Sequence, residues 1–362
     1  MVCPLNWGLG HAARCIPIIH KLQLAGFEVI VAADGRALAL LEEECSDIKS
    51  ITLPGFSPDF PSGRNLILKI PGWLCSLSWH TFKEHQDISL LVDEHNIDVV
   101  ISDNRFGLFT KKAKCVFITH QVMFKTPLPL KFSEPFLYRI NRFFINKFDV
   151  CWIPDLPGSD NLSGDLSHKY PLPENARFIG LLSRFQREKV AEEIADKSVL
   201  ALLSGPEPQR TIFEGLIIGQ LKKTSIPATI VRGTPSELNS KEPVNNVSLY
   251  NHLLTGELAG NIRKAGFVIC RSGYSTLMDM AVLGKKAVLL VPTPGQTEQE
   301  YLAKRLHKLG WMNYQDQNNF NIDKPANEVG EYCGINLPTD ETLLDMQIEA
   351  LRISLNHGSA SR

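Results

Sequence analysis

The sequence predicts an α/β protein of two domains, each built on a doubly wound, mostly parallel β-sheet. Three observations support this fold class. The chain has 362 residues, which is enough for two domains of about 180 residues each. Short apolar runs alternate with segments of helical periodicity, as in β-α-β units. The clearest unit runs from Phe267 to Tyr301, where a strand, a Gly/Ser/Thr loop, a helix, a strand and a polar loop follow one another.

The first half follows this alternation from its start. Apolar runs predict strands at residues 2–5, 28–33, 48–52, 98–102, 114–119 and 148–153. Helical spacing predicts helices at 11–24, 36–44 and 79–95, with a Pro/Gly-rich loop over 54–64. We therefore assign residues 1–155 to the first domain and residues 156–176, which are rich in Pro and Gly, to a linker.

The second half repeats the architecture. Strands are predicted at 198–203, 228–232, 247–250, 267–270 and 286–291, and helices at 186–196, 209–222, 254–265 and from about 276 to 284. This assigns 177–335 to the second domain. Thr339-Asp-Glu-Thr342 is a helix-start signal, so we expect a last helix to about residue 357. The segment 336–362 is expected to pack back on the first domain and to end in a disordered tail from 358.

Composition excludes several function classes. The net charge of −1 gives no global electrostatic basis for binding nucleic acid. The eight cysteines stand singly, which indicates buried small residues in a reducing compartment and predicts neither disulfides nor a metal site. No signal peptide is visible, and no apolar run approaches the roughly 20 residues that span a bilayer. We therefore expect a cytoplasmic protein.

The first loop carries a candidate catalytic base. Gly8-x-Gly10-x-x-Ala13 follows a strand and opens a helix, and Asp34 ends the next strand. This layout matches a dinucleotide fingerprint, which would make the protein a nicotinamide enzyme. The competing hypothesis uses His11, because the positive end of a helix dipole keeps an imidazole neutral and able to act as a general base. A third possibility is that His11 only caps the helix.

Asp103 is the candidate partner of His11. It ends a buried strand at the carboxyl edge of the first sheet, where doubly wound folds bind their ligands. A carboxylate beside His11 would orient the ring and stabilise its cation, although Asp103 could instead only cap a turn. Four further residues near this edge are expected to contact a substrate, namely the acceptor of a transferred group: Asn104, Arg105, His120 and Gln121.

The second half contains the candidate donor site. Ser204-Gly205 and the loop from Ser272 to Thr276 each join a strand to a helix, whose first N–H groups can bind an anion. Two such loops at one sheet edge can bracket a diphosphate, with Asp279 placed to accept from ribose hydroxyls. The expected donor-binding residues are Gly10, Ser204, Gly205, Arg232, Arg271, Ser272, Gly273, Ser275, Thr276 and Asp279, with Glu298, Gln299 and Glu300 reading the sugar.

Residues 122–148 mix large apolar residues with Lys125, Lys131, Arg139, Arg142 and Lys147. Such a segment can lie on an anionic membrane surface. Equally, its aromatic residues can pack into the domain while the cations are solvated. The sequence leaves both possibilities open.

These motifs resemble those of glycosyltransferases with the GT-B fold. Val268-Ile-Cys-Arg-Ser-Gly273, Asp279, Leu290-Val-Pro292 and Gln299–Tyr301 are similar to the donor half of the bacterial enzymes that add N-acetylglucosamine to a lipid-linked peptidoglycan precursor. Leu203–Arg210 resembles their first phosphate loop. The likeness covers about 198–310 well and the first half loosely. It implies two Rossmann-like domains facing each other across a cleft, and a role in cell-envelope or polysaccharide synthesis.

By that resemblance, Asp279 would hold the ribose of a UDP-sugar, Ser204 and Ser272–Thr276 the diphosphate, and Gln299 with Glu300 the sugar. The His11/Asp103 placement is similar to the base pair of plant small-molecule glycosyltransferases. The first loop departs from the peptidoglycan family, because Gly8–Arg14 has fewer glycines. Gly8–Cys15 instead matches the GxGHxxRC pattern of nucleotide-sugar hydrolases of nonulosonic acid synthesis. Residues 122–148 do not match the peptidoglycan family in detail.

We therefore expect an inverting glycosyltransferase that uses a UDP-sugar, with His11 as general base oriented by Asp103. Helix N-termini would stabilise the leaving diphosphate, so we expect no metal or other cofactor. The acceptor would be a glycan or a lipid-linked saccharide. The alternatives are a UDP-sugar hydrolase with the same donor site and a non-catalytic subunit that binds nucleotide sugars.

Overall fold

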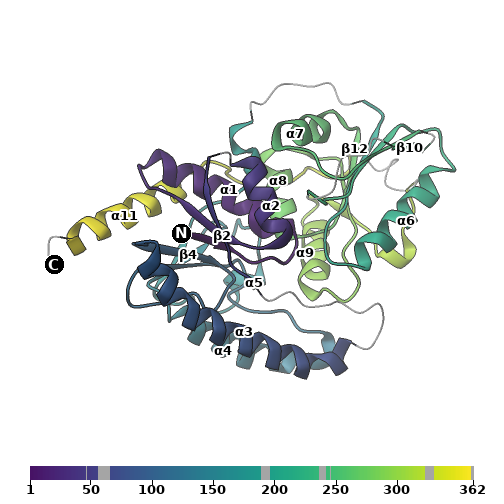
Figure 1. The fold of residues 1–362 in the computed structure, drawn as a ribbon. Coiled ribbons are helices and arrows are strands. Elements are labelled where there is room, and N and C mark those ends of the chain that lie inside the picture. The colour runs from purple at the N-terminus through teal and green to yellow at the C-terminus, as the bar shows by residue number, and fades with distance from the viewer. Residues whose placement is uncertain are drawn as a thin grey trace.

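The computed structural model describes residues 1–45, 47–55, 66–188, 196–235, 242–244, 246–322 and 330–359. Within these ranges the chain forms two seven-stranded sheets, one in each half, with helices on both faces (Figure 1). The first sheet is parallel throughout. In the second, a single edge strand is antiparallel. The predicted fold class, two doubly wound Rossmann-like halves, is confirmed.

The first sheet has the strand order β3-β2-β1-β4-β5-β6-β7. Its central strand β4 is fully buried, as expected for a strand covered on both faces. The strands are β1 (Val2–Pro4), β2 (Ile30–Ala33), β3 (Lys49–Thr52), β4 (Val99–Asp103), β5 (Lys114–Ile118), β6 (Val150–Ile153) and β7 (Ala176–Phe178).

Two layers of helices cover this sheet. One face packs against α1 (Leu9–Leu24) and α2 (Gly35–Glu44). The other packs against α3 (Leu66–Glu94) and α4 (Glu134–Ile145), which contribute buried residues such as Ile88 and Ile145 to one apolar cluster. The 3₁₀ helix η1 (Leu128–Ser133) precedes α4, and the short helix α5 (Asp165–His168) follows β6.

The second sheet has the order β10-β11-β9-β8-β12-β13-β14. Its strands are β8 (Val199–Leu202), β9 (Ala228–Val231), β10 (Glu242–Val244), β11 (Val247–Tyr250), β12 (Phe267–Cys270), β13 (Val288–Leu290) and β14 (Asn313–Tyr314). Its helices are α6 (Gln209–Leu221), α7 (Thr255–Lys264), α8 (Tyr274–Val282) and α9 (Thr297–Lys308), with 3₁₀ turns η2 (Arg184–Arg187) and η3 (Gln317–Asn319).

The structure differs from the sequence-based elements in several places. Strand β7, at the end of the segment predicted as a linker, pairs with β6 and completes the first sheet. Helix α3 begins at Leu66, earlier than predicted, and passes through Pro71 and Gly72. Most of the loop expected at 54–64 and of the helix expected at 186–196 lies outside the described residues. Residues 184–187 form a 3₁₀ turn.

The halves share a continuous apolar core. One cluster of buried residues runs from α1 and α2 through β8 to α7, α8 and α9. Polar contacts flank it: Glu44 at the end of α2 accepts from the backbone N–H of Thr255 at 2.9 Å and so caps α7. On the other side, the Tyr301 hydroxyl of α9 accepts from the Asp165 N–H at 2.6 Å.

The last helix, α11 (Thr342–Ser359), returns to the first half. It packs against α1 and β7, and Lys21 Nζ lies 2.9 Å from Glu341 and 2.8 Å from Asp345. The tail expected to be disordered from 358 overlaps the end of α11, and residues 360–362 lie outside the described part. Among the helices described here, none has the length and apolarity needed to cross a membrane.

The cysteines are mostly core residues. Six of the seven described are free and buried: Cys3, Cys15, Cys45, Cys115, Cys151 and Cys270. Cys333 is exposed and also free. Cys75 lies where side chains are not described.

Phe117 provides a test of the first core. It is fully buried, and its ring lies 5.0 Å from that of Phe106 and 4.8 Å from that of Phe148. Phe117→Ala should lower the free energy of unfolding by about 3–5 kcal/mol, because it removes these contacts and leaves a cavity. Urea unfolding followed by circular dichroism measures this loss. The control Phe143→Ala, on a side chain that is 58% exposed, should stay within about 0.5 kcal/mol of the parent protein.

Candidate active site

The candidate site lies where the start of α1 meets the second half. The preceding residue, Gly8, has φ 79°, a left-handed conformation that glycine adopts without strain, and no side chain caps the helix. A side chain at Gly233, just after β9, would lie 3.6 Å from Leu9 Cδ1. Gly10 O accepts from Ser275 Oγ of α8 at 2.8 Å. The first turn of α1 is therefore in direct contact with the carboxyl edge of the second sheet.

His11 and Asp103 are brought together as the sequence predicts. His11 Nδ1 lies 3.2 Å from Asp103 Oδ2, and the His11 side chain is 15% exposed while Asp103 is fully buried. Burial lowers the pKa of His11, although the Asp103 carboxylate opposes this. Burial alone would raise the pKa of Asp103, but the neighbouring Arg14 and His11 outweigh it and hold that pKa well below its usual range.

Arg14 was not predicted as a site residue. Its side chain is 1% exposed and forms a two-pronged ion pair with Asp103, with Nε donating to Oδ2 at 2.7 Å and Nη2 to Oδ1. Nη2 also lies 2.9 Å from His11 Nδ1. The sequence held a signal for this, because residues three apart on a helix share a face. Nothing in the sequence showed that both would face Asp103.

His120 and Gln121 link the two halves. His120 Nε2 lies 2.8 Å from Glu298 Oε1 of α9, and Gln121 Nε2 donates to Glu298 Oε2. The His120 ring stacks on Tyr274 of α8, with centroids 4.1 Å apart and planes 7° from parallel. Burial would raise the pKa of Glu298, but His120 holds it below its ordinary value. Glu298, expected to read a sugar, therefore contacts two residues expected to contact an acceptor.

The start of α8 has the features expected of an anion site. Its N-cap residue, Gly273, has no side chain with which to cap the helix. Ser272 is fully buried, and its hydroxyl donates to the backbone oxygen of Gln299 at 2.8 Å. Ser275 faces Gly10, and Thr276 is partly exposed in the same turn. Ser272 therefore stabilises the loop, whereas Ser275 joins it to the first half.

Asp279 lies further along α8, five residues after its first residue, Tyr274. Its Oδ1 accepts from Ser183 Oγ at 2.6 Å. Burial raises the pKa of Asp279 to about 6, with Arg184 and Ser183 opposing the shift. A carboxyl group with a raised pKa, beside a helix start and the boundary between halves, is typical of a binding site.

The loop after β13 is ordered by the residues expected to read the sugar. Gln299 Oε1 accepts from the Thr293 N–H at 2.9 Å, and Glu300 Oε1 accepts from the Gly295 N–H at 2.9 Å. A side chain at Gly205, which has φ 97°, would lie 4.0 Å from Thr293 Oγ1. The loop containing Ser204 and Gly205 thus approaches the loop after β13.

The three candidate arginines have partners within the protein. Arg232 pairs with Glu214 of α6, with Nη2 2.8 Å from Oε1. Arg271 is fully buried; it donates to the backbone oxygen of Val291 at 3.0 Å and to Gln317 Oε1 at 2.7 Å. Arg105 is 2% exposed and pairs with Glu84 of α3 at 2.9 Å. Arg271 and Arg105 support the fold around the site and present no surface to a ligand.

Asn104 follows Asp103 in a left-handed conformation, with φ 56°. With its amide oriented to satisfy both polar atoms, its nitrogen donates to Thr119 Oγ1 at 2.9 Å and its oxygen accepts from Arg14 Nη2 at 3.3 Å. It therefore lies beside Arg14.

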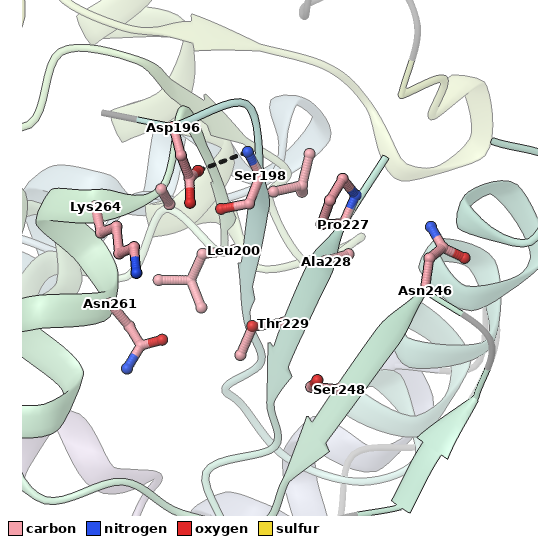
Figure 2. A pocket seen from close by; sticks show the side chains of 12 residues that line it. Asp196, Ser198, Leu200, Pro227, Ala228, Thr229, Asn246, Ser248, Asn261 and Lys264 are labelled. Carbon is pink, nitrogen blue, oxygen red and sulfur yellow. Dashed lines mark hydrogen bonds between the residues drawn. The ribbon is translucent and has the colours of Figure 1, made fainter. Parts of the chain in front are cut away.

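A cavity of about 220 Å³ lies elsewhere in the second half, lined by residues that include Asp196, Ser198, Thr229, Asn261 and Lys264 (Figure 2). The side chains surround the amino ends of β8, β9 and β11. Ligands of doubly wound sheets bind at the carboxyl ends. This cavity is therefore not the candidate active site.

The comparisons with known proteins agree with this geometry. Residues 236–332 match the model of the glycosyltransferase family 28 C-terminal domain. The second half therefore contains a glycosyltransferase family 28 C-terminal domain, and the whole chain has the GT-B fold. The match includes β12, α8, α9 and the loops between them, and therefore Ser272–Thr276, Asp279 and Glu298–Glu300. No curated protein matches the sequence significantly.

Solved structures match nearly the whole chain. SnogD from Streptomyces nogalater is 14% identical, with a TM-score of 0.54, over 97% of this chain and 98% of its own. MurG from Acinetobacter baumannii is 13% identical, with a TM-score of 0.53, over 97% and 98%. Arabidopsis thaliana UGT89C1 is 15% identical, with a TM-score of 0.59, over 97% and 92%. At these identities the likeness establishes the fold of both halves.

The raised pKa of Asp279 predicts a pH-dependent cost to stability. The pKa is about 6 when folded against an ordinary 3.8, so the folded state holds the proton more tightly and stability falls as pH rises through this window. Asp279→Asn should therefore raise the melting temperature at pH 7.5, and the gain should shrink as pH falls toward 4. The control Asp160→Asn, on an exposed loop, should show no such trend. A gain for Asp279→Asn that grows at low pH would contradict the assignment.

Proposed function

We propose that this glycosyltransferase moves a sugar from a UDP-sugar to an acceptor hydroxyl with inversion at the anomeric carbon, and that His11 is the general base. One observation carries the proposal: His11, paired with Asp103, lies next to the residue whose backbone contacts the start of α8. The candidate base and the candidate diphosphate loop are therefore adjacent, although they come from different halves.

The proposed reaction follows from these positions. With Nδ1 turned to Asp103, His11 accepts the acceptor's hydroxyl proton at Nε2. The acceptor oxygen forms a bond to the anomeric carbon, and the bond from that carbon to the diphosphate breaks. The electron pair leaves with the diphosphate, which the N–H groups at the start of α8 and the Ser204–Gly205 loop stabilise. We propose that this needs no metal, and that Asp279 holds the ribose.

The donor assignment has independent support. The matched domain spans the start of α8, Asp279 and the loop after β13, but not the Ser204–Gly205 loop. Arabidopsis thaliana UGT89C1, which shares the fold, has been crystallised with UDP-L-rhamnose. Gln299 and Glu300 order the loop after β13 through their side chains, so we propose that their part in sugar recognition is to shape this loop.

His11→Ala tests the mechanism. Loss of a general base should reduce kcat by about 10²–10⁴-fold, with the KM for the UDP-sugar nearly unchanged because His11 acts on the acceptor. Steady-state kinetics with a panel of UDP-sugars and acceptors measures both. His20→Ala, which removes the other histidine of α1, should retain activity. An NMR spectrum showing product with the donor's anomeric configuration would exclude the inverting mechanism, and full activity in His11→Ala would exclude His11 as the base. Binding of a UDP-sugar by the parent protein without turnover would favour the non-catalytic binding subunit.

A UDP-sugar hydrolase is the second candidate, and one observation favours it. The residues expected to contact an acceptor are engaged within the protein: His120 and Gln121 with Glu298, and Arg105 with Glu84. Because these residues already have partners within the protein, they are less able to bind a sugar acceptor. Water needs no such contacts, and His11 could deprotonate it in the same way. Turnover of a UDP-sugar without acceptor, as fast as with any acceptor tested, would establish this alternative.

We also propose that the acceptor is a glycan or lipid-linked saccharide of the cell envelope, reached at an anionic membrane surface through η1 and α4. Large apolar residues on these helices are exposed: Leu128, Phe132, Phe136, Ile140 and Phe143, at 86%, 80%, 63%, 39% and 58%. Phe136, Ile140 and Phe143 follow the spacing of one helix face. The exposed Lys131, Arg139 and Lys147 add positive charge. Lys125 instead pairs with Asp165 at 2.6 Å, so it is not part of this surface.

Charge reversal tests this surface. Each basic residue near an anionic leaflet contributes about 1 kcal/mol, so Lys131→Glu with Arg139→Glu should strongly weaken binding to vesicles containing phosphatidylglycerol. Sedimentation with vesicles measures the bound fraction. Reversal of Lys222 and Lys223, exposed on the second half, should leave binding intact. If all variants bind alike, the membrane assignment is wrong.

A further inference from the structure

The buried Arg14 is central to the candidate site, yet the proposed reaction does not use it. At 1% exposure its side chain cannot touch a substrate. Each of its three guanidinium nitrogens nevertheless lies within hydrogen-bonding distance of another site residue. Nε and Nη2 contact Asp103, Nη2 lies 2.9 Å from His11 Nδ1, and Nη1 lies 3.1 Å from His120 Nδ1.

Arg14 fixes which ring nitrogen of His120 carries the proton. A guanidinium only donates hydrogen bonds, so His120 Nδ1 must accept from Arg14 Nη1 and cannot carry a proton. The proton of the neutral ring is then on Nε2, which donates to Glu298 Oε1 at 2.8 Å. Stacking on Tyr274 holds the ring in this orientation. A chain of contacts thus runs from Glu298 in the second half through His120 to Arg14.

The arginine also changes the electrostatics of His11. In an isolated histidine–carboxylate pair, the carboxylate favours the charged imidazolium and raises the pKa of the histidine. Here both Asp103 oxygens already accept from a permanent cation, and that cation lies 2.9 Å from the same ring nitrogen that faces Asp103. The two hydrogens of Arg14 Nη2 have other acceptors, Asp103 Oδ1 and the amide oxygen of Asn104, so Nη2 brings charge to His11 without a hydrogen bond. The His11 proton therefore stays on Nδ1 and is donated to Asp103 Oδ2, which leaves Nε2 free to accept. The carboxylate is largely neutralised, and a proton added to His11 would be placed against a positive charge.

The titratable and charged groups around His11 come from five elements. They are Arg14 on its own helix, Asp103 at the end of β4, His120 after β5, the Tyr274 phenol at the start of α8 and Glu298 on α9. Burial raises the pKa of the Tyr274 phenol, so this group is neutral at physiological pH. Of the five, Arg14 is the permanent cation.

We propose that Arg14 is a positioning residue that keeps His11 neutral, by neutralising Asp103 and by placing its own charge against the imidazole. This rests on the proposed role of His11 as a base, because a base must be unprotonated to act. The arrangement would let His11 accept a proton at a pH at which a simple histidine–aspartate pair is already protonated. Glu298 of the second half contacts His120, which in turn contacts the guanidinium, so the arrangement is complete when the halves are in contact.

Arg14→Gln and Arg14→Lys test this in the full-length protein. Glutamine removes the charge, so the pKa of His11 should rise by about one unit or more. Lysine keeps the charge and should leave this pKa near that of the parent protein. NMR titration of protein labelled with ¹³C and ¹⁵N in histidine measures it, with the His11 signal assigned from His11→Gln. The parent His11 should titrate below the ordinary value of 6.5.

Activity gives a second measurement. In Arg14→Gln the acidic limb of the pH profile of kcat/KM should move to higher pH, with about tenfold loss at pH 6.5 and recovery toward pH 9. The KM for the UDP-sugar should change less than about twofold. A residue with only a structural role would lower activity at every pH without moving the limb. Arg14→Lys should restore the position of the limb.

The outcomes separate this inference from the proposed function. The NMR titration needs no turnover, so it decides the role of Arg14 even if no UDP-sugar is a substrate. An unchanged His11 pKa in folded Arg14→Gln would overturn the inference. If Arg14→Gln does not fold, a parent His11 pKa above 7 would do so, because that is the behaviour of a simple histidine–aspartate pair.

Discussion

The ion pair between Arg14 and Asp103 is the constraint on which the candidate site depends. Both side chains are almost completely excluded from solvent, and a charge left unpaired in such a place destabilises a protein by several kcal/mol. The pair is therefore held in one geometry, and it fixes the positions of the side chains that contact it. His11 and His120 both contact the same guanidinium. The same ion pair thus positions both His11, the candidate base, and His120, which contacts the second half.

The contact between halves has an apolar and a polar part with different roles. The apolar cluster that joins α1 with α8 and α9 provides the stability, since burial of apolar surface dominates association energies. The polar contacts provide the alignment. Ser275 on Gly10, Glu298 on His120 and Glu44 on the start of α7 each join a specific residue of one half to the other. Together they place the start of α8 against the start of α1, so that two helix N-termini face one region.

Most of the fold could be predicted because its central strands are unbroken apolar runs. Residues of β4 and β12 are buried throughout, and such runs stand out in any sequence. The elements that were missed have the opposite composition. β7 and β10 are edge strands that carry Arg177 and Glu242 with Pro243, and so show no apolar run. The helix predicted from residue 79 begins at Leu66 and includes Pro71 and Gly72, two residue types that disfavour a helix interior.

The candidate site could be predicted only in part. His11 and Asp103 follow strand ends, and sheet topology brings such positions together. Arg14 is different, because its role comes from Asp103, 89 residues away in the sequence. Its spacing places it on the helix face of His11, but this spacing does not distinguish a buried arginine from a solvated one. Likewise, Glu298 looked like a sugar ligand in a polar loop. Its contact with His120 joins residues 178 positions apart, which no motif reveals.

The return of α11 to the first half has a mechanical consequence. Because β7 and α11 both belong to the first half, the chain crosses to the second half after residue 178 and comes back before residue 342. The second half is thus inserted into the first and is connected to it by two segments of the chain. One connecting segment would allow the second half to rotate about several axes, whereas two connecting segments favour bending about the axis that joins them. The two crossings therefore restrict how far the second half can rotate against the first, which helps to keep Glu298 in register with His120.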